Sequence, residues 1–521
     1  MALSLNACML ILKEHHLLKS SAIQGDMDTV MTSVSYDSRK VQPNGLFFCK
    51  GENFRTIYLT MAKDKGAITY VAEQPYPEGK GMNAFIVRNV QKAMALLAAA
   101  YYNYPQDELF IIAYTGTKGK TTSAYFTKSI LDEMTDHKTA LFSTIDRVVG
   151  PKPDQRFKSD LTTPESLDLF HDMRSAVDNG MTHLVMEVSS QAYLKSRVFG
   201  LTYDVGFFLN ITPDHIGPNE HPNFANYLHC KLQLLVNSRV CVINAETDHF
   251  PEVYAAATTT TDPDSIFLFA NANYQEPHNI PIDFRMESHE ADLFESRFTF
   301  TPVTPKAISF GVHGDYQLKL VGDYNESNAT AAIIGSLLAG ADTYETQEGL
   351  KNVTIPGRME SALAPGHGAV YVDYAHNYGS MHALLSFLIR QYKHPRIIVV
   401  LGAPGDKGVS RRADFARVLN QYASDVFLTT DDPGFEDPAD IAAEINRGID
   451  HEQVRVTTEL DRPKAIHDAI LDANPGDIVV VAGKGADPYQ KVRGVDTPYP
   501  TDMVIVRQVI DQLPAAKGAD K

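Results

Sequence analysis

The feature that most constrains this chain is a series of short, almost wholly apolar runs, each separated from the next by a stretch with helical spacing. The runs do not alternate between apolar and polar residues, so both faces of each strand are expected to be buried. Strands of this kind, with helices between them, suggest a parallel sheet and an α/β fold. The clearest runs are LFIIAYT (109–115), HLVMEV (183–188), YDVGFFLN (203–210), RVCVIN (239–244), AVYVDY (369–374), RIIVVLG (396–402), DVFLTT (425–430) and DIVVVAG (477–483).

These runs fall into three blocks. A chain of 521 residues exceeds what one hydrophobic core usually supports, so two to four domains are expected. We predict a smaller α/β N-terminal domain at 1–106, with strands near 67–73 and 84–90. A central domain at 107–354 would hold a P-loop ATPase-like parallel sheet, and a C-terminal domain at 355–521 would be Rossmann-like.

The charge balance and the cysteines narrow the class of protein. The net charge of −17 argues against nonspecific attraction to nucleic acid or to anionic membranes. The four cysteines form no CxxC pair and no zinc-like spacing. The apolar segment near the start has no basic region before it, and no run of roughly 18 apolar residues occurs. We therefore expect a cytoplasmic protein with no nucleic-acid partner and no membrane insertion.

A turn rich in glycine, lysine and threonine follows the strand at 109–115 and leads directly into helical spacing. Backbone N–H groups and the helix dipole meet an anion in this geometry. Lys120 would reach the outer phosphates of a nucleoside triphosphate, and the Thr121 hydroxyl would bind Mg²⁺. The full Walker pattern is not met because Tyr114 occupies its first glycine position, so an ordinary strand-to-helix turn is the alternative. The predicted nucleotide contacts here are Thr115, Gly116, Thr117, Lys118, Gly119, Lys120, Thr121 and Thr122.

Carboxylate and imidazole groups lie at the ends of two further strands. Glu187 ends one strand, and Asp214 and His215 follow the other. Oxygen-rich groups beside a phosphate loop, at the carboxyl edge of a parallel sheet, are suited to a hard cation. A single Glu or His is usually structural, but together with the phosphate loop Glu187 and His215 are predicted Mg²⁺ ligands.

Lys231 lies on the apolar stripe of a predicted helix, beside Tyr227, Leu228 and Leu235. The commoner explanation of such a lysine is that its amine reaches out of the core to solvent. The alternative is that burial lowers its pKa, so that the neutral amine takes up CO₂ and the resulting carbamate ligates a metal. The residues alone leave both explanations open.

Three loops of the third block follow strand ends, where α/β sheets place ligands. Asp431, Asp432 and Asp487 would make this region acidic and suited to a cationic substrate. Solvated acidic turns are the alternative. The loops are LGAPGDKGVSRR (401–412), TTDDPGFED (429–437) and AGKGADPYQ (482–490).

Several motifs, in order along nearly the whole chain, resemble those of the Mur ligases, the ATP-dependent amide-bond-forming enzymes of peptidoglycan precursor synthesis. Within that family the chain is most similar to the tripeptide synthetases of the MurE type, which add the third residue of the stem peptide. The motifs are TGTKGKTT (115–122), EVSSQ (187–191), NITPDH (210–215), GDYNESNATAA (322–332), PGRME (356–360) and DYAHN (373–377).

The resemblance implies a first domain that binds UDP, a central ATPase domain and a C-terminal domain that brings the amino acid. It implies ATP, two Mg²⁺ ions and a carbamate on Lys231 as cofactors, with Lys120, Lys231, His215 and Glu187 as catalytic residues. Thr121, Glu187, His215 and carbamylated Lys231 would ligate metal. Further ATP contacts would be Asn325, Asn328, Arg358 and Asp373, and contacts to UDP-MurNAc-L-Ala-D-Glu would be Ser38, Thr162, Thr163, Ser189 and Arg197.

The resemblance also bears on the amino acid that is added. Relatives that add diaminopimelate have an arginine where this chain has Gly434, and that arginine pairs with the distal carboxylate. Asp432 and Asp487 keep the pocket acidic, which favours the ε-ammonium of L-lysine, while Lys407 could meet the α-carboxylate. Ornithine and diaminopimelate are the alternatives. The residues implied in amino-acid recognition are Lys407, Asp431, Asp432, Pro433, Gly434, Gly483 and Asp487.

The implied reaction transfers the γ-phosphate of ATP to the D-glutamyl γ-carboxylate, and the amine of L-lysine then displaces phosphate from the acyl phosphate. The expected partners are these small molecules only, and the expected state is a monomer. Two other functions remain open: a nucleotide-binding regulator without ligase chemistry, and a ligase acting on another substrate, such as a folylpolyglutamate synthase or the next muramyl ligase.

Overall fold

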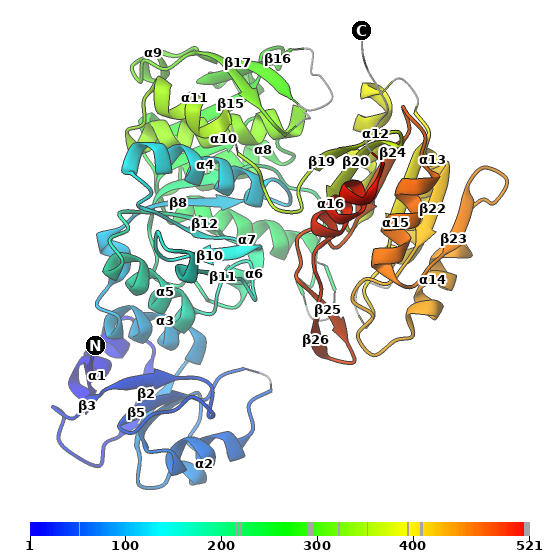
Figure 1. The fold of residues 1–521 in the computed structure, drawn as a ribbon. Coiled ribbons are helices and arrows are strands. Elements are labelled where there is room, and N and C mark those ends of the chain that lie inside the picture. Colours follow the sequence, from blue (N-terminus) through cyan, green and yellow to red (C-terminus); the bar gives the residue numbers. More distant parts are fainter. Residues whose placement is uncertain are drawn as a thin grey trace. The chain divides into compact units, whose positions relative to one another are not determined.

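The computed structural model describes residues 1–51, 53–214, 216–217, 220–289, 295–320, 323–351, 353–392, 395–406 and 410–514 (Figure 1). The chain forms two compact units. The first comprises Met1–Glu287, Thr299–Asp315 and Ser327–Leu350, and the second comprises Ser288–Phe298, Tyr316–Glu326 and Lys351–Lys521. The three domain ranges expected from the sequence stay a prediction.

The N-terminal part of the first unit is built on a five-stranded sheet of order β2-β7-β6-β5-β4. Only β2 is antiparallel to its neighbour. The strands are β2 (Leu18–Ala22), β4 (Ser33–Ser35), β5 (Gly45–Phe48), β6 (Ala67–Ala72) and β7 (Asn83–Val87), and a separate pair joins β1 (Leu3–Ser4) to β3 (Val30–Met31). The helices are α1 (Leu5–Glu14), α2 (Thr56–Asp64) and α3 (Val90–Tyr101).

A larger sheet follows, of order β11-β10-β9-β12-β8-β13-β14-β15-β16-β17-β18. The strands from β9 to β16 in this order are parallel, and β10 and β11 are antiparallel additions. The strands are β8 (Phe110–Thr115), β9 (Thr139–Phe142), β10 (Asp146–Val148), β11 (Arg156–Lys158), β12 (His183–Glu187), β13 (Tyr203–Phe208), β14 (Ser238–Asn244), β15 (Ile266–Asn271), β16 (Phe284–Ser288), β17 (Ser296–Pro302) and β18 (Gly314–Leu318).

The position of β8 in this sheet decides where the phosphate loop lies. Because β8 is flanked by β12 and β13, the turns after all three strands meet at one carboxyl edge. The intervening helices are α4 (Lys120–Thr135), α5 (Ser166–Asp178), α6 (Ser190–Leu194), α7 (Phe224–Val236), α8 (Phe250–Ala257), α9 (Pro305–Ile308), α10 (Asp323–Ala339) and α11 (Thr343–Lys351).

The second unit contains a six-stranded sheet of order β19-β20-β24-β21-β22-β23, parallel except for β19. Its strands are β19 (Glu360–Ala364), β20 (Gly368–Asp373), β21 (Ile397–Leu401), β22 (Asp425–Leu428), β23 (Arg455–Thr458) and β24 (Ile478–Ala482). Its helices are α12 (Tyr378–Gln391), α13 (Ser410–Tyr422), α14 (Pro438–Asn446), α15 (Arg462–Asp472) and α16 (Asp502–Gln512), and β25 (Tyr489–Val492) pairs with β26 (Val495–Pro498) in a hairpin.

The predicted α/β class is confirmed, with parallel sheets formed by the apolar runs. Every residue of β21, β22 and β24 is buried, as their unbroken apolar sequences require. In the part of the chain that the structure describes, no helix is both long and apolar enough to cross a membrane.

Candidate active site

The turn predicted to bind phosphate, residues 116–119, is called the phosphate turn below. It lies between β8 and α4, as the sequence predicts. Gly119 has φ +86° and immediately precedes the helix, and a Cβ there would lie 2.3 Å from Oδ1 of Asn328. Glycine is therefore favoured at this position, mainly by the backbone conformation and also by the close approach of Asn328. The Lys120 side chain points back toward the turn, and its Nζ donates to the Gly116 carbonyl oxygen at 2.7 Å.

The segment after β13 fixes the same turn from the other side. The backbone N–H of Lys118 donates to Asn210 Oδ1 at 2.9 Å, and Asn210 Nδ2 donates back to the Lys118 carbonyl oxygen at 3.1 Å. Thr212 N–H donates to Thr117 Oγ1 at 3.0 Å. Each of these contacts joins residues more than ninety positions apart, so the loop conformation depends on the β8–β13 pairing.

Glu187 lies at the centre of the predicted metal region and is 1% exposed. Its Oε1 accepts hydrogen bonds from Thr121 Oγ1 at 2.8 Å and from the Thr144 N–H at 2.7 Å. A hydroxyl and a carboxylate at the end of a phosphate turn are the oxygen donors that Mg²⁺ prefers, so these residues fit that ion. His215, the other predicted ligand, lies outside the described residues.

Lys231 is buried on α7, at 2% exposure, so the explanation that its amine reaches solvent is wrong. Its Nζ donates to the Gly116 carbonyl oxygen at 2.7 Å, the same oxygen that Lys120 contacts. Burial, reinforced by the charge of Lys120, holds the pKa of Lys231 well below its usual value. The structure therefore places a readily deprotonated amine beside the phosphate turn.

The residues predicted to contact the muramyl dipeptide gather around the same sheet edge. Thr163 is fully buried, and its Oγ1 accepts from the Ser189 N–H at 3.0 Å while donating to the Glu187 carbonyl oxygen at 3.0 Å. Thr162 Oγ1 accepts from Thr144 Oγ1 at 3.0 Å. Arg197 Nη1 donates to the Thr163 carbonyl oxygen at 3.3 Å. The Thr163 hydroxyl therefore both donates and accepts a hydrogen bond within the protein.

Sequence reasoning missed a charged network that extends this region toward the N-terminal sheet. The Glu165 carboxylate forms an ion pair with Lys50 and accepts from Arg197 Nε at 3.1 Å. The Lys50 amine also lies 4.6 Å from the centre of the Tyr36 ring, and Tyr36 OH donates to Asp168 at 2.5 Å. Glu165 directly follows Thr162-Thr163-Pro164, and this position in the sequence is the one signal that could have drawn attention to it.

Ser38, the predicted nucleotide-sugar contact, lies in the turn after β4 and is 6% exposed. Ser35 and Asp37 shape that turn, because Ser35 Oγ accepts from the Asp37 N–H at 3.0 Å. Asp37 in turn pairs with the exposed Arg39. Nothing in these contacts assigns a ligand to Ser38.

The predicted adenine-side and domain-bridging residues belong to different parts of the chain. On α10, Asn328 accepts from Ser123 Oγ at 3.4 Å, and Asn325 is 2% exposed. In the second unit, Asp373 Oδ2 accepts from the Met359 N–H at 2.8 Å. Burial raises the pKa of Asp373 above its usual value, although the nearby Arg358 opposes the shift. The approach of Arg358 and Asp373 to ATP stays a prediction.

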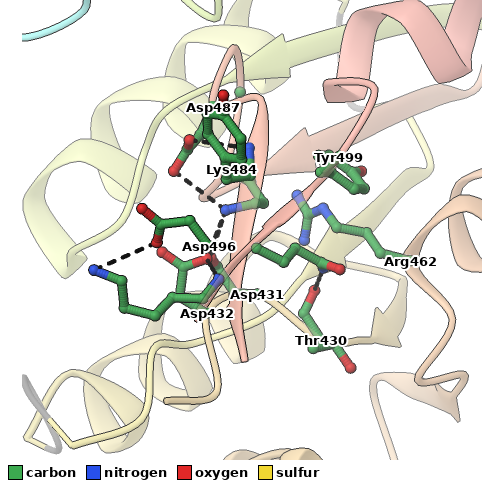
Figure 2. A network of polar contacts seen from close by, with 12 residues as sticks. Thr430, Asp431, Asp432, Arg462, Lys484, Asp487, Asp496 and Tyr499 are labelled. Carbon is green, nitrogen blue, oxygen red and sulfur yellow. Dashed lines mark hydrogen bonds and ion pairs between the residues drawn. The ribbon is translucent and has the colours of Figure 1, made fainter. Parts of the chain in front are cut away.

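The loops after β22 and β24 in the second unit bring the three predicted acidic residues together (Figure 2). The sequence motifs predict no cation among these three carboxylates, but the structure places Lys484 there. Nζ of Lys484 lies 2.7 Å from Asp432 Oδ1, 3.3 Å from Asp487 Oδ2 and 3.8 Å from Asp431 Oδ1. The pocket formed by Asp431, Asp432 and Asp487 is therefore acidic, and the Lys484 ammonium group neutralises part of its charge. Lys407, the predicted partner of the α-carboxylate, lies outside the described residues.

The structure gives a second reason for glycine at position 434, besides the absence of a side chain that could bind a carboxylate. Its φ is +60°, and a Cβ would lie 2.2 Å from Oδ2 of Asp406. That oxygen accepts from the Phe435 N–H at 2.7 Å, and the Gly405 N–H donates to the Asp432 carbonyl oxygen at 2.9 Å. The loops after β21 and β22 thus interlock, and Asp406 occupies the space beside residue 434. Pro433 also takes part in this close approach of the two loops. Its carbonyl oxygen would lie 1.9 Å from a Cβ added at Gly405.

A buried ion pair supports the loop after β24. Arg462 and Asp502 both have fully buried side chains and share two hydrogen bonds of 2.8 Å. Asp502 also accepts from the Gly485 N–H at 2.9 Å and from Tyr499 OH at 2.6 Å. Gly483 is held close to Asp431, since a Cβ there would lie 2.9 Å from Asp431 Oδ2.

Residues 114–335 match the family model of the Mur ligase middle domain, and residues 357–485 match that of the Mur ligase glutamate ligase domain. A UDP-N-acetylmuramyl-tripeptide synthetase of Latilactobacillus sakei (strain 23K) is 69% identical over 98% of this chain and 100% of its own length. A UDP-N-acetylmuramoyl-L-alanyl-D-glutamate--L-lysine ligase of Enterococcus faecalis (strain V583) is 48% identical over 92% of each chain.

Solved structures agree with these relatives. A UDP-N-acetylmuramoyl-L-alanyl-D-glutamate--2,6-diaminopimelate ligase superposes with a TM-score of 0.65 at 26% identity, over 98% of this chain and 99% of that one. MurF from Thermotoga maritima in complex with ADP has a TM-score of 0.58 at 15% identity, over 92% and 97%, and at that identity it supports the fold alone.

Proposed function

Because the chain belongs to the Mur ligase family, we propose that it joins L-lysine to the D-glutamyl γ-carboxylate of UDP-MurNAc-L-Ala-D-Glu at the expense of ATP. The ATP-dependent formation of an amide bond in peptidoglycan precursor synthesis is the activity of this family.

The observation that carries the proposal is the convergence on one sheet edge of the phosphate turn, the Thr121–Glu187 pair and two lysine amines. Lys120 and the N–H groups at the start of α4 would hold the phosphates of ATP. Bound Mg²⁺, held by Thr121 and Glu187, would neutralise the charge that develops on the transferred phosphoryl group. Thr162, Ser189 and Arg197 border this edge and would orient the acceptor carboxylate for attack.

We propose that Lys231 is carbamylated in the active enzyme. Its amine is buried, its pKa is lowered by that burial, and it donates to the Gly116 carbonyl oxygen of the phosphate turn. A neutral amine is the form that combines with CO₂, and the carbamate would supply an oxygen ligand where the bare lysine offers none. Conversion would also place an anion near the Lys120 amine, which contacts the same Gly116 carbonyl oxygen.

L-Lysine is the amino acid that the second unit fits best. Asp431, Asp432 and Asp487 set against the single ammonium of Lys484 leave a formal charge of −2, which attracts a further ammonium group. The distal carboxylate of diaminopimelate would meet this negative charge, and Gly434 offers no arginine to bind it. The relative from Enterococcus faecalis, named as a lysine ligase, supports the same choice.

An amino-acid panel tests the proposal directly. Purified protein is given UDP-MurNAc-L-Ala-D-Glu, Mg²⁺ and ATP, and phosphate release and tripeptide product are measured with L-lysine, L-ornithine and meso-diaminopimelate. We expect kcat/KM to be highest for L-lysine and about 10-fold or more lower for ornithine, which lacks one methylene. A higher value for diaminopimelate would refute the choice of lysine. Absence of phosphate release with every amino acid would favour a nucleotide-binding regulator.

A further inference from the structure

His221 lies in the segment between β13 and α7, and it is fully buried. Both of its ring nitrogens are hydrogen-bonded: the Nδ1–H donates to Asn226 Oδ1 at 2.7 Å, and Nε2 accepts from the Ser190 hydroxyl at 2.9 Å. An amide oxygen can only accept, so the proton lies on Nδ1 and the ring is held in one orientation. The backbone is held as well, because the Gly217 N–H donates to the His221 carbonyl oxygen at 3.1 Å.

The first partner of this imidazole, Ser190, begins α6 shortly after the strand end that carries Glu187. The preceding residue, Ser189, donates its N–H to Thr163 Oγ1 at 3.0 Å. Ser189 is proposed to orient the acceptor carboxylate, and Glu187 is proposed to hold Mg²⁺. The bond between Ser190 and His221 therefore fixes the acceptor side of the site.

The second partner, Asn226, lies in the first turn of α7, the helix that carries Lys231. The next residue, Tyr227, meets the His221 ring edge-on, with 5.2 Å between the ring centres. Tyr227 OH forms a hydrogen bond of 3.0 Å with Thr117 Oγ1 of the phosphate turn, and Lys231 Nζ lies 4.9 Å from the centre of the Tyr227 ring. His221 thus packs behind the tyrosine that joins α7 to the phosphate turn.

An imidazole does more here than fill space. Two directional bonds from a rigid ring set both the distance and the angle between their partners, which apolar contacts do not. A displacement of the reacting groups by about 1 Å can lower a rate by about 10²-fold. A constraint of this kind therefore matters in a site that is assembled from several segments of the chain.

We propose that His221 is a positioning residue of the ligase reaction: it holds the start of α6 at a fixed distance from α7 and so aligns the acceptor side of the site with Lys231 and the phosphate turn. The imidazole acts through Ser190 and Asn226 and does not touch a substrate. This inference rests on the proposed function.

The test uses variants that remove one bond at a time. In His221→Asn the shorter amide can still donate to Asn226 from near the position of Nδ1, but the bond to Ser190 is lost, and Ser190→Ala removes the same bond from its other side. His229→Asn is the matched control, because His229 lies exposed on α7. Initial rates of phosphate release give kcat and KM with UDP-MurNAc-L-Ala-D-Glu, ATP and the amino acid that the wild type uses best.

We expect kcat to fall about 10-fold to 100-fold in His221→Asn and at least about 5-fold in Ser190→Ala, because the reacting groups are displaced although every group that touches them remains. The KM for ATP should stay within about 2-fold of the wild-type value, since Asn210 and Thr212 hold the phosphate turn by separate bonds. His221→Gln, whose longer amide reaches the Ser190 hydroxyl, should recover part of the lost kcat. His229→Asn should keep the wild-type values.

Thermal unfolding and circular dichroism distinguish positioning from folding. kcat is measured well below the Tm of every variant, where each is as fully folded as the wild type. A lowered Tm with unchanged kcat in His221→Asn and Ser190→Ala would show a merely structural role and overturn the proposal. The double variant Ser190→Ala/His221→Asn should lose no more kcat than His221→Asn alone, because both changes break one bond, and losses that multiply would also overturn it.

If His221→Asn does not fold, Ser190→Ala decides alone, because it removes a single hydroxyl group, and an unchanged kcat in that variant overturns the proposal. A wild type that releases no phosphate with any amino acid would refute the proposed function. An active wild type beside unaffected variants would refute only the positioning role of His221.

Discussion

Two lysine side chains contact the carbonyl oxygen of Gly116, and they are expected to have different roles, one as a phosphate contact and one as a carbamate. Lys120 reaches it from the first turn of α4 and Lys231 from α7. Both amines cannot remain charged at low cost so close together, and the pKa of Lys231 is the one that burial lowers. Separate substitutions can distinguish a phosphate contact from a carbamate.

Lys120→Ala should lower kcat for product formation at least about 10³-fold, because the charge that meets the phosphates is lost. Product is measured by chromatography of the UDP-linked tripeptide. Lys128→Ala is the control: this lysine lies on the same helix and pairs with Asp132 away from the turn, and it should keep near wild-type activity. Retained turnover in Lys120→Ala would refute the assignment of the phosphate turn.

Lys231→Ala should be inactive and should regain part of its activity when short carboxylic acids such as formate or acetate are added. The cavity left by the side chain would admit an acid that replaces the carbamate oxygens. Phosphate release is followed as a function of acid concentration. Lys120→Ala should gain nothing from the same acids, and equal rates for Lys231→Ala with and without acid would favour a packing role.

Gly434→Arg should lower the use of L-lysine, but the structure adds a steric cause to the electrostatic one. Any side chain at Gly434 would collide with the Asp406 carboxylate and adopt a φ of +60°, which costs about 1–3 kcal/mol. Gly434→Ala therefore separates the two effects in assays of KM for L-lysine and diaminopimelate. If the alanine variant loses as much lysine activity as the arginine variant, charge at this position is not the cause.

At the scale of elements, Glu165 ties three segments together, because it accepts from Lys50 after β5 and from Arg197 after α6 while itself preceding α5. Lys50→Met should raise the KM for UDP-MurNAc-L-Ala-D-Glu by several-fold and leave the KM for ATP within about 2-fold, since a partly buried ion pair is lost on the dipeptide side alone. Initial rates with each substrate varied in turn measure both values.

The control for this prediction is Lys19→Met, which removes an exposed lysine of the same N-terminal sheet that donates to the Glu73 carbonyl oxygen. It should leave both KM values unchanged. Equal increases in the two KM values of Lys50→Met would show that the network supports the whole unit rather than one substrate.

At the scale of the whole molecule, the acidic pocket belongs entirely to the second compact unit and the phosphate turn entirely to the first. L-Lysine alone should therefore raise the unfolding temperature of the second unit. At 100 times its Kd, a ligand stabilises the unit that binds it by about 2.7 kcal/mol. Differential scanning calorimetry with and without L-lysine measures the shift, and D-lysine is the control. A shift confined to the first unit would place the amino-acid site elsewhere.

The sequence by itself determined the α/β class and the strands formed by unbroken apolar runs, and it predicted the chemistry of the turns. Unbroken apolar runs such as those of β21 and β24 can be buried only on both faces, and a Gly-Lys-Thr turn between a strand and a helix has few other uses. These are local patterns, readable from residues close together along the chain. The resemblance to one family then supplied the roles proposed for residues such as Glu187 and Arg197.

Only the tertiary structure decided which distant groups meet. The burial of Lys231 against Gly116 depends on α7 packing over β8, and glycine is favoured at residue 434 by its φ of +60° and by Asp406, which comes from another strand end. Lys484 lies one residue from a predicted pocket residue, yet its position inside the carboxylate cluster depends on the order β24-β21-β22. Pairing energies between charged groups are set by distance and burial, and the tertiary structure fixes both.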